Sequence, residues 1–173
     1  MKFNLKVNIF ATIKEEIRFD KVTYYSVCLE ENDESLFLQF LNSHVSEEYQ
    51  EQLSLIRSWL RKIGNEIGAQ ERYFRNESFR GGDTRALPPP TRYLEIECNL
   101  RLYCMRINDD IVILFSGAEK TAVTAQECDN VYPHFLQANK LSKAIYTAIL
   151  EKDIEIDDED GLLLYDNLLR LEI

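Results

Sequence analysis

The stretch NLRLYCMRINDDIVILFSGAEKT, residues 99–121, decides the fold class of this chain. Two apolar runs flank a short acidic segment at residues 108–110, where Asn and Asp suit a tight turn because they tolerate its backbone angles and bond their own main chain. The preceding segment RYLEIECN, residues 92–99, has the composition of a further strand. We therefore predict a three-stranded antiparallel meander over residues 92–117.

Alternation along the middle strand of this meander separates its side chains into two groups. One face carries Arg101, Tyr103 and Met105, and the other carries Leu100, Leu102, Cys104 and Arg106. We expect the second face to pack on helices and the first to point outward, next to Lys120. Arg106 should pair with a carboxylate, because burying it unpaired would cost several kcal/mol. The substitution Arg101→Ala should change the free energy of unfolding by no more than about 0.5 kcal/mol, as at other exposed sites.

The chain before the meander has strand-like and then helix-like patterns. Residues 2–13 and 22–31 alternate with period two and are rich in β-branched and aromatic residues, so we predict two strands, with Glu15, Glu16 and Asp20 in the link between them. Residues 35–44 and 46–68 repeat apolar residues every three or four positions, which predicts an αα-hairpin whose first helix is capped by Asn32 or Asp33.

A loop and a C-terminal helix complete the pattern. The paired glycines at 81–82 and the three prolines at 88–90 favour a loop over residues 76–91. Residues 131–153 trace an amphipathic helix, followed by a tail expected to dock back on the core. The predicted fold class is therefore α+β, in a single domain spanning residues 1–173: N-terminal strands, an αα-hairpin, an antiparallel β-meander and a C-terminal helix.

Composition and charge exclude several classes of protein. Hydrophobic residues make up 45% and charged residues 29% of the 173 residues, as in an ordinary globular domain. The formal net charge of −10 argues against nonspecific affinity for nucleic acid, which requires clustered lysines and arginines. No apolar stretch is long enough to span a bilayer and no signal peptide is evident, so we expect a cytoplasmic protein without a membrane partner. Four cysteines without CxxC spacing favour buried free thiols over a zinc site, and no cofactor is expected.

The negative charge is distributed unevenly. Residues 71–121 contain eight Lys or Arg and eight Asp or Glu, so this segment is neutral and the whole net charge lies outside it. Two interpretations remain open. The arginines are either solvated and ion-paired strand residues, or they form a local basic face on an acidic protein.

The chain resembles the RelE/HigB-like toxin superfamily of bacterial type II toxin–antitoxin systems, both in the order of its predicted elements and in the sequence pattern RYFR…ALP…LRLYCMRINDDIVILFSGAEKT. The resemblance is strongest over residues 36–149. This resemblance implies a metal-independent, ribosome-associated mRNA endonuclease that a small helix-turn-helix antitoxin neutralises. It also implies roles for individual residues: catalytic Arg101, Tyr103 and Lys120, and RNA-binding Arg75, Arg80 and Arg85. Arginine and lysine suit this chemistry because attack by a 2′-hydroxyl builds negative charge on the phosphate, and a tyrosine can relay a proton or stack on a base.

A second hypothesis uses the same fold differently. The net charge of −10 and the N- and C-terminal extensions beyond a minimal toxin are also typical of a noncatalytic protein-interaction module. Such a module would bind a protein partner, and its function would not depend on Arg101 or Lys120.

Overall fold

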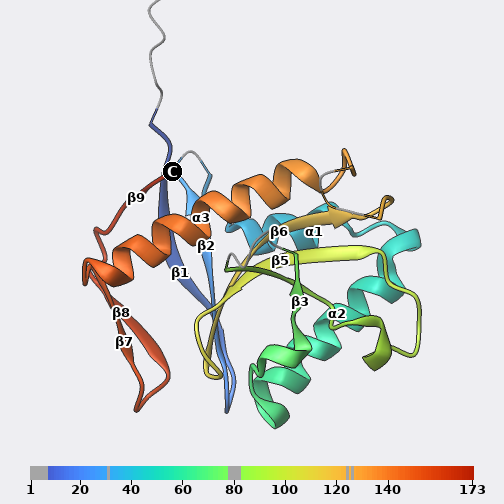
Figure 1. Cartoon of the computed structure of the whole chain (residues 1–173), viewed down its shortest axis with the longest axis horizontal. Helices are drawn as coiled ribbons and strands as arrows, with labels where there is room; N and C mark the ends of the chain where they lie inside the picture. Colours follow the sequence, from blue (N-terminus) through green and yellow to red (C-terminus); the bar gives the residue numbers. More distant parts are fainter. Residues whose placement is uncertain (1–7, 31, 78–82, 124, 126) are drawn as a thin grey trace, which may run out of the picture.

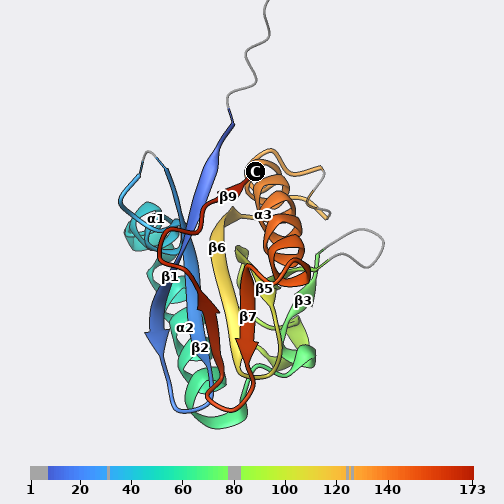
Figure 2. The ribbon, with the colours of Figure 1, turned by 90° about the vertical axis from the view of Figure 1, so that its left-hand side faces the viewer.

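The computed structural model describes residues 8–30, 32–77, 83–123, 125 and 127–173. The fold has one large mixed sheet, and other elements cover both of its faces (Figures 1 and 2). The strand order in the sheet is β3-β4-β5-β6-β2-β1-β9, and β7 and β8 form a separate two-stranded hairpin. The strands are β1 Phe10–Arg18, β2 Thr23–Leu29, β3 Arg75–Asn76, β4 Thr84–Leu87, β5 Leu100–Arg106, β6 Ile111–Glu119, β7 Ile154–Asp157, β8 Leu162–Tyr165 and β9 Leu171–Glu172. The α-helices are α1 Leu36–Ser43, α2 Gln50–Lys62 and α3 Tyr132–Leu150.

The central hairpin of the sheet is the pair predicted from sequence. Strands β5 and β6 are antiparallel, and the Asn108 side chain accepts a hydrogen bond from the Asp110 N–H at 2.8 Å in the turn between them. The pairing register shifts by one residue between Leu102 and Cys104. Next to this shift the two backbones come so close that a Cβ on Gly117 would lie 1.7 Å from the carbonyl oxygen of Arg101, so only glycine fits there.

The N-terminal strands also form the predicted antiparallel pair, with a different boundary. Strand β1 runs through Glu15 and Glu16, and the chain reverses only at Phe19, whose N–H donates to the Val22 carbonyl at 2.9 Å. Glu15 and Glu16 were therefore wrongly placed in the link, whereas Asp20 lies in it as predicted. Strand β2 then lies parallel to β6, with Ser26 opposite Leu114, which joins the hairpin to the meander.

Helices α1 and α2 cover one face of the sheet, as predicted for the αα-hairpin (Figure 2). The N-cap of α1 is Ser35, whose hydroxyl accepts from the Leu38 N–H at 3.2 Å, and not Asn32 or Asp33. The core on this face contains Phe40, Ile56 and the strand side chains Leu100, Leu102 and Cys104. A short helical turn of three residues, η1 Glu47–Tyr49, precedes α2, and a π-helical turn, η2 Ile63–Ile67, follows it.

The opposite face of the sheet is covered too, by α3 and the β7–β8 hairpin, so the prediction that it meets solvent is wrong. Tyr103, Met105 and Phe135 belong to one buried cluster there, and the Tyr25 hydroxyl accepts a hydrogen bond from the Leu163 N–H at 3.0 Å. The tail docks on the core as predicted, because β9 pairs with β1. Apolar residues on both faces of β5 and β6 agree with a sheet that is buried on both sides.

The first strand of the meander differs from the prediction. The strand beside β5 is β4, which lies inside the segment predicted to be a loop. The segment predicted to be a strand, 92–99, instead begins with a helical turn, η4 Thr91–Tyr93, and continues without regular structure. The class α+β holds, with a mostly antiparallel sheet and one parallel pair of strands. No helix among the described residues is long and apolar enough to cross a membrane.

Candidate functional site

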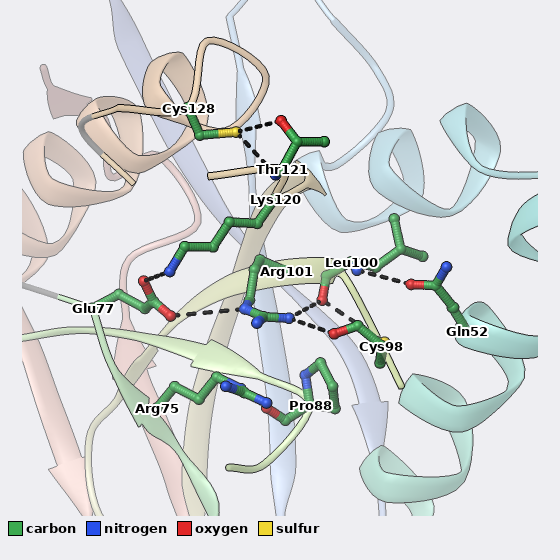
Figure 3. Close-up of polar contacts among 10 residues, drawn as sticks. All are labelled: Gln52, Arg75, Glu77, Pro88, Cys98, Leu100, Arg101, Lys120, Thr121 and Cys128. Carbon is green, nitrogen blue, oxygen red and sulfur yellow. Dashed lines mark hydrogen bonds and ion pairs between the residues drawn. The ribbon is translucent and has the colours of Figure 1, made fainter. Parts of the chain in front are cut away.

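Four charged side chains, on or next to β3, β5 and β6, lie close together, and we call Arg75, Glu77, Arg101 and Lys120 the Glu77 cluster (Figure 3). The carboxylate of Glu77 lies between two cations. Its Oε2 is 3.2 Å from Lys120 Nζ, and its Oε1 is 3.8 Å from Arg101 Nε. The three side chains are 10–13% exposed, so solvent screens these charges only partly.

Arg101 is held by the backbone as well as by Glu77. Its Nη1 donates to the carbonyl oxygens of Cys98 at 2.8 Å and Leu100 at 3.0 Å. The whole residue is 9% exposed. These contacts fix the guanidinium in one orientation, with Nε toward the carboxylate.

Regular strand pairing positions the cluster. Glu77 follows β3, Arg101 is the second residue of β5, and Lys120 follows β6, where its N–H donates to the Asn99 carbonyl at 2.8 Å. The Gln52 side chain of α2 accepts hydrogen bonds from the backbone N–H groups of residues 99 and 100, at 2.7 and 3.0 Å, and so anchors the start of β5.

The cluster carries more positive than negative charge. Arg101 and Lys120 pair with the carboxylate of Glu77, and the nearby Arg75 Nε donates to the Pro88 carbonyl at 2.9 Å. Burial, and after it the charge of Arg101, lowers the pKa of the Arg75 guanidinium. An excess of cations at a partly dehydrated position favours binding of an additional anion.

Tyr103 lies next to this cluster, on the face of the sheet that α3 covers. Its side chain is fully buried, and the ring packs edge-to-face on Phe135 with a centroid distance of 5.8 Å. Burial raises the pKa of its hydroxyl, and the nearby Glu77 adds to the rise. Among the described residues, the Tyr103 hydroxyl and Arg101 Nε are buried polar groups without a hydrogen-bond partner.

Cys128 lies beside the end of β6, in the loop before α3 (Figure 3). Its Sγ is 3.3 Å from the Thr121 N–H and 3.5 Å from the Thr121 hydroxyl. Burial opposes ionisation, but hydrogen bonds from Thr121 and from the backbone N–H groups of residues 130 and 131 outweigh it and lower the pKa of the thiol to about 7.

The structure brings together four of the residues that the sequence singled out. Arg101 and Lys120 pair with Glu77, Arg75 lies close enough for the charge of Arg101 to act on it, and Tyr103 lies near Glu77 and Arg101. The prediction that Arg101 and Tyr103 point outward is wrong, because α3 and the loop preceding it cover that face. Catalytic roles for these residues stay predictions.

The other predicted basic residues have different positions. Arg85 lies on the opposite face of β4 from Thr84 and forms an ion pair with Glu71 at 3.5 Å, so it does not join the Glu77 cluster. Arg80 lies outside the described residues. Arg106 pairs with the carboxylate of Asp109 as predicted, and its Nε donates to the Ala69 carbonyl at 2.5 Å.

Glu77 is the functional candidate that the sequence did not reveal. It was one of eight acidic residues in a neutral segment, with nothing to distinguish it from a solvated side chain. The available signal was its spacing: two positions after Arg75, an extended chain places both side chains on the same side.

A second polar pair links β6 to α3. Ser116 Oγ is hydrogen-bonded to His134 Nδ1 at 2.7 Å, at the edge of a cavity of about 240 Å³. Burial lowers the pKa of His134 and keeps its ring neutral. Within the described part of the chain no carboxylate is hydrogen-bonded to His134, so the pair lacks the third member of a hydrolytic triad.

Comparison of the chain with protein-family models, with curated proteins and with solved structures found no match. In the described ranges, no group of three or more His, Cys, Asp or Glu side chains is arranged to hold a metal ion.

Proposed function

We propose that this protein is a RelE/HigB-like toxin component that cleaves mRNA without a metal, and that the Glu77 cluster is its catalytic centre. The observation that carries the proposal is the pairing of two cations, Arg101 and Lys120, with the one carboxylate of Glu77, next to a third cation, Arg75, in a protein whose net charge is −10. Ion pairs that only solvate an exposed strand would not need to lie together at one buried position. A phosphate of RNA would complete the charge balance of the cluster.

The chemistry follows from the side chains. The 2′-hydroxyl oxygen of the substrate attacks the adjacent phosphorus, a 2′,3′-cyclic phosphate forms, and the bond to the 5′-oxygen breaks. In this proposal Glu77 accepts the proton of the 2′-hydroxyl, and Lys120 stabilises the phosphate charge and donates a proton to the leaving 5′-oxygen. Positioned proton transfer of this kind contributes about 10²- to 10⁴-fold to a rate.

The buried residues have positioning roles in this scheme. Arg101 contacts Glu77 and two carbonyl groups, so we assign it to holding the carboxylate and not to touching RNA. Tyr103 is fully buried, so we assign it to packing next to Arg101 and Glu77 and not to contacting RNA. Arg101 and Tyr103 therefore have positioning roles, Lys120 keeps the catalytic role expected from the sequence, and Glu77 is added as the general base.

The test is induction of the protein in bacteria, with growth and transcript cleavage measured by end mapping. Wild type should arrest growth and cleave transcripts, and Glu77→Gln and Lys120→Met should each lower cleavage about 100-fold or more. Lys140→Met is the matched control, because Lys140 is exposed on α3 and its loss changes the charge equally. Normal growth and intact transcripts with abundant wild-type protein would reject the enzyme proposal.

One observation favours a second candidate, a noncatalytic protein-interaction module. Arg101 and Tyr103 are buried, and an ion-paired cluster of this kind also serves to attach β3 and the segment after it to the sheet. Under this proposal Lys120→Met leaves partner binding unchanged. Co-purification followed by mass spectrometry separates the two candidates, because recovery of a small DNA-binding antitoxin or of ribosomes supports the toxin alone.

A further inference from the structure

Three aromatic rings gather on the α2 side of the molecule, each with a cation at its face. Trp59, Tyr73 and Tyr93 contact one another, with ring centroids 5.8 Å apart for Trp59 and Tyr73, 6.4 Å for Trp59 and Tyr93, and 5.2 Å for the two tyrosines. The cations are Lys62 over Trp59 at 4.9 Å, Arg72 over Tyr73 at 4.9 Å, and Arg92 over Tyr93 at 4.8 Å. We call these six residues the aromatic–basic platform.

Three separate segments build the platform. Helix α2 supplies Trp59 and Lys62, the helical turn η3 Glu71–Tyr73 supplies the second pair, and η4 supplies the third. All three cations are exposed, whereas the tyrosines are half-buried and Trp59 is buried, with 9% of its surface exposed. Burial of hydrophobic surface accounts for the rings, but it does not account for a cation placed over each of them.

A groove of about 400 Å³ opens beside the platform, lined by Trp59, Lys62, Tyr93, Leu55, Ile96 and Glu95 among others. Its walls combine aromatic and aliphatic surface with one lysine. The acidic residues Glu51 and Glu95 also line it. Their charge disfavours phosphate inside the groove and leaves the exposed cations of the platform as the anion-binding side.

We propose that the aromatic–basic platform binds single-stranded RNA, with bases entering the groove against Trp59 and Tyr93 and phosphates lying on Lys62, Arg72 and Arg92. The choice of RNA as the polymer rests on the function proposed above. Its chemistry fits because aromatic rings accept bases of any sequence by stacking, at about 1–3 kcal/mol per base, while exposed cations neutralise the backbone. The platform would then hold the substrate strand while the Glu77 cluster cleaves it.

The platform contains a reporter of its own, because Trp59 is the only tryptophan in the chain. A 12-nucleotide single-stranded RNA should quench its fluorescence, and the titration gives Kd directly. The variant Lys62→Ala/Arg72→Ala/Arg92→Ala should raise Kd tenfold or more. It should also reduce the slope of log Kd against log salt by about 2, since each phosphate contact on a single strand releases about 0.7 counter-ion. Tyr93→Leu keeps apolar volume, and its loss of stacking should raise Kd about tenfold.

A matched control variant tests whether RNA affinity depends on the cations of the platform or only on the net charge of the protein. Lys21→Ala/Lys140→Ala/Lys143→Ala removes three exposed cations elsewhere, and it should leave Kd within about twofold of wild type. Circular dichroism confirms that each variant is folded. Absence of quenching, equal weakening by the control variant, or quenching by anionic vesicles but not by RNA would overturn the assignment.

The two proposals fail separately. Lys120→Met should lower cleavage about 100-fold or more, while added RNA should still quench the fluorescence of Trp59, because Trp59 belongs to the platform. RNA binding without any cleavage by wild type would reject the endonuclease and support the platform. Cleavage by wild type, together with unchanged Kd in the platform variant, would support the endonuclease and overturn the platform.

Discussion

Replacing Arg101 by alanine should destabilise the protein strongly, contrary to the expectation for an exposed strand residue. The substitution removes a guanidinium that donates to the carbonyl oxygens of Cys98 and Leu100 and contacts Glu77 at 3.8 Å. It also leaves the carboxylate of Glu77, itself 10% exposed, with Lys120 as its ion-pair partner.

The magnitude follows from these contacts. Hydrogen bonds from a charged donor contribute about 1.5–3 kcal/mol, and breaking a buried ion pair by removing one partner costs about 3–5 kcal/mol. The Arg101–Glu77 contact is long and slightly exposed, so we take the lower part of these ranges and expect a loss of about 3 kcal/mol. For a chain of this size that corresponds to a fall in Tm of about 6–12 °C.

Urea denaturation followed by the fluorescence of Trp59 measures this loss. With an m-value of about 2 kcal/mol/M, the midpoint should fall by about 1.5 M. Lys140→Ala, at an exposed position on α3, is the control and should stay within about 0.5 kcal/mol of wild type. A midpoint for Arg101→Ala equal to that of this control would refute the structural role assigned to Arg101.

Three further predictions concern other features of the fold. Gly117→Ala should abolish folding or lower Tm by more than 10 °C in a thermal melt, because its Cβ would overlap the backbone of Arg101 and cannot be relieved by a side-chain rotation. Arg106→Ala should lower the free energy of unfolding by about 1–2 kcal/mol in urea, since a charge-assisted bond to backbone and the pair with Asp109 are lost; an unchanged midpoint would contradict this. The folded-state pKa of Cys128, about 7, lies below the ordinary thiol value of 9.0, so its contribution to stability should grow between pH 7 and 9 and disappear below pH 7. Thiolate absorbance at 240 nm against pH, with Cys128→Ser as reference, should show that titration, and a midpoint near the ordinary value would contradict it.

The sequence by itself determined the local elements of this protein. Alternation separated Arg101 and Tyr103 from Leu102 and Cys104, and the structure confirms the two groups on opposite faces of β5. Apolar spacing located α1, α2 and α3 to within a few residues. These features depend on residues only a few positions apart, so short segments of the sequence are enough to predict them.

Tertiary structure decided what each face and segment meets. Alternation shows that Tyr103 differs from Leu102 in direction, but not that α3, some thirty residues later, covers it. Strand β4 pairs with β5 despite the glycines and prolines around it, because pairing with β3 on one side and with the apolar strand β5 on the other outweighs weak local propensity. No local sequence pattern indicated that β2 would lie beside β6 and parallel to it, because the two strands are far apart in the sequence.

The candidate site shows the same division. Its cations were visible as residue types in the sequence, but Glu77, Arg101 and Lys120 lie on three segments, and only strand pairing brings the two cations to 3.8 and 3.2 Å from the Glu77 carboxylate. Electrostatic interactions depend on that distance and on the exclusion of water, and both are properties of the folded chain. The sequence therefore supplied the charges, and the packing of β3, β5, β6 and α3 determined that they are buried together.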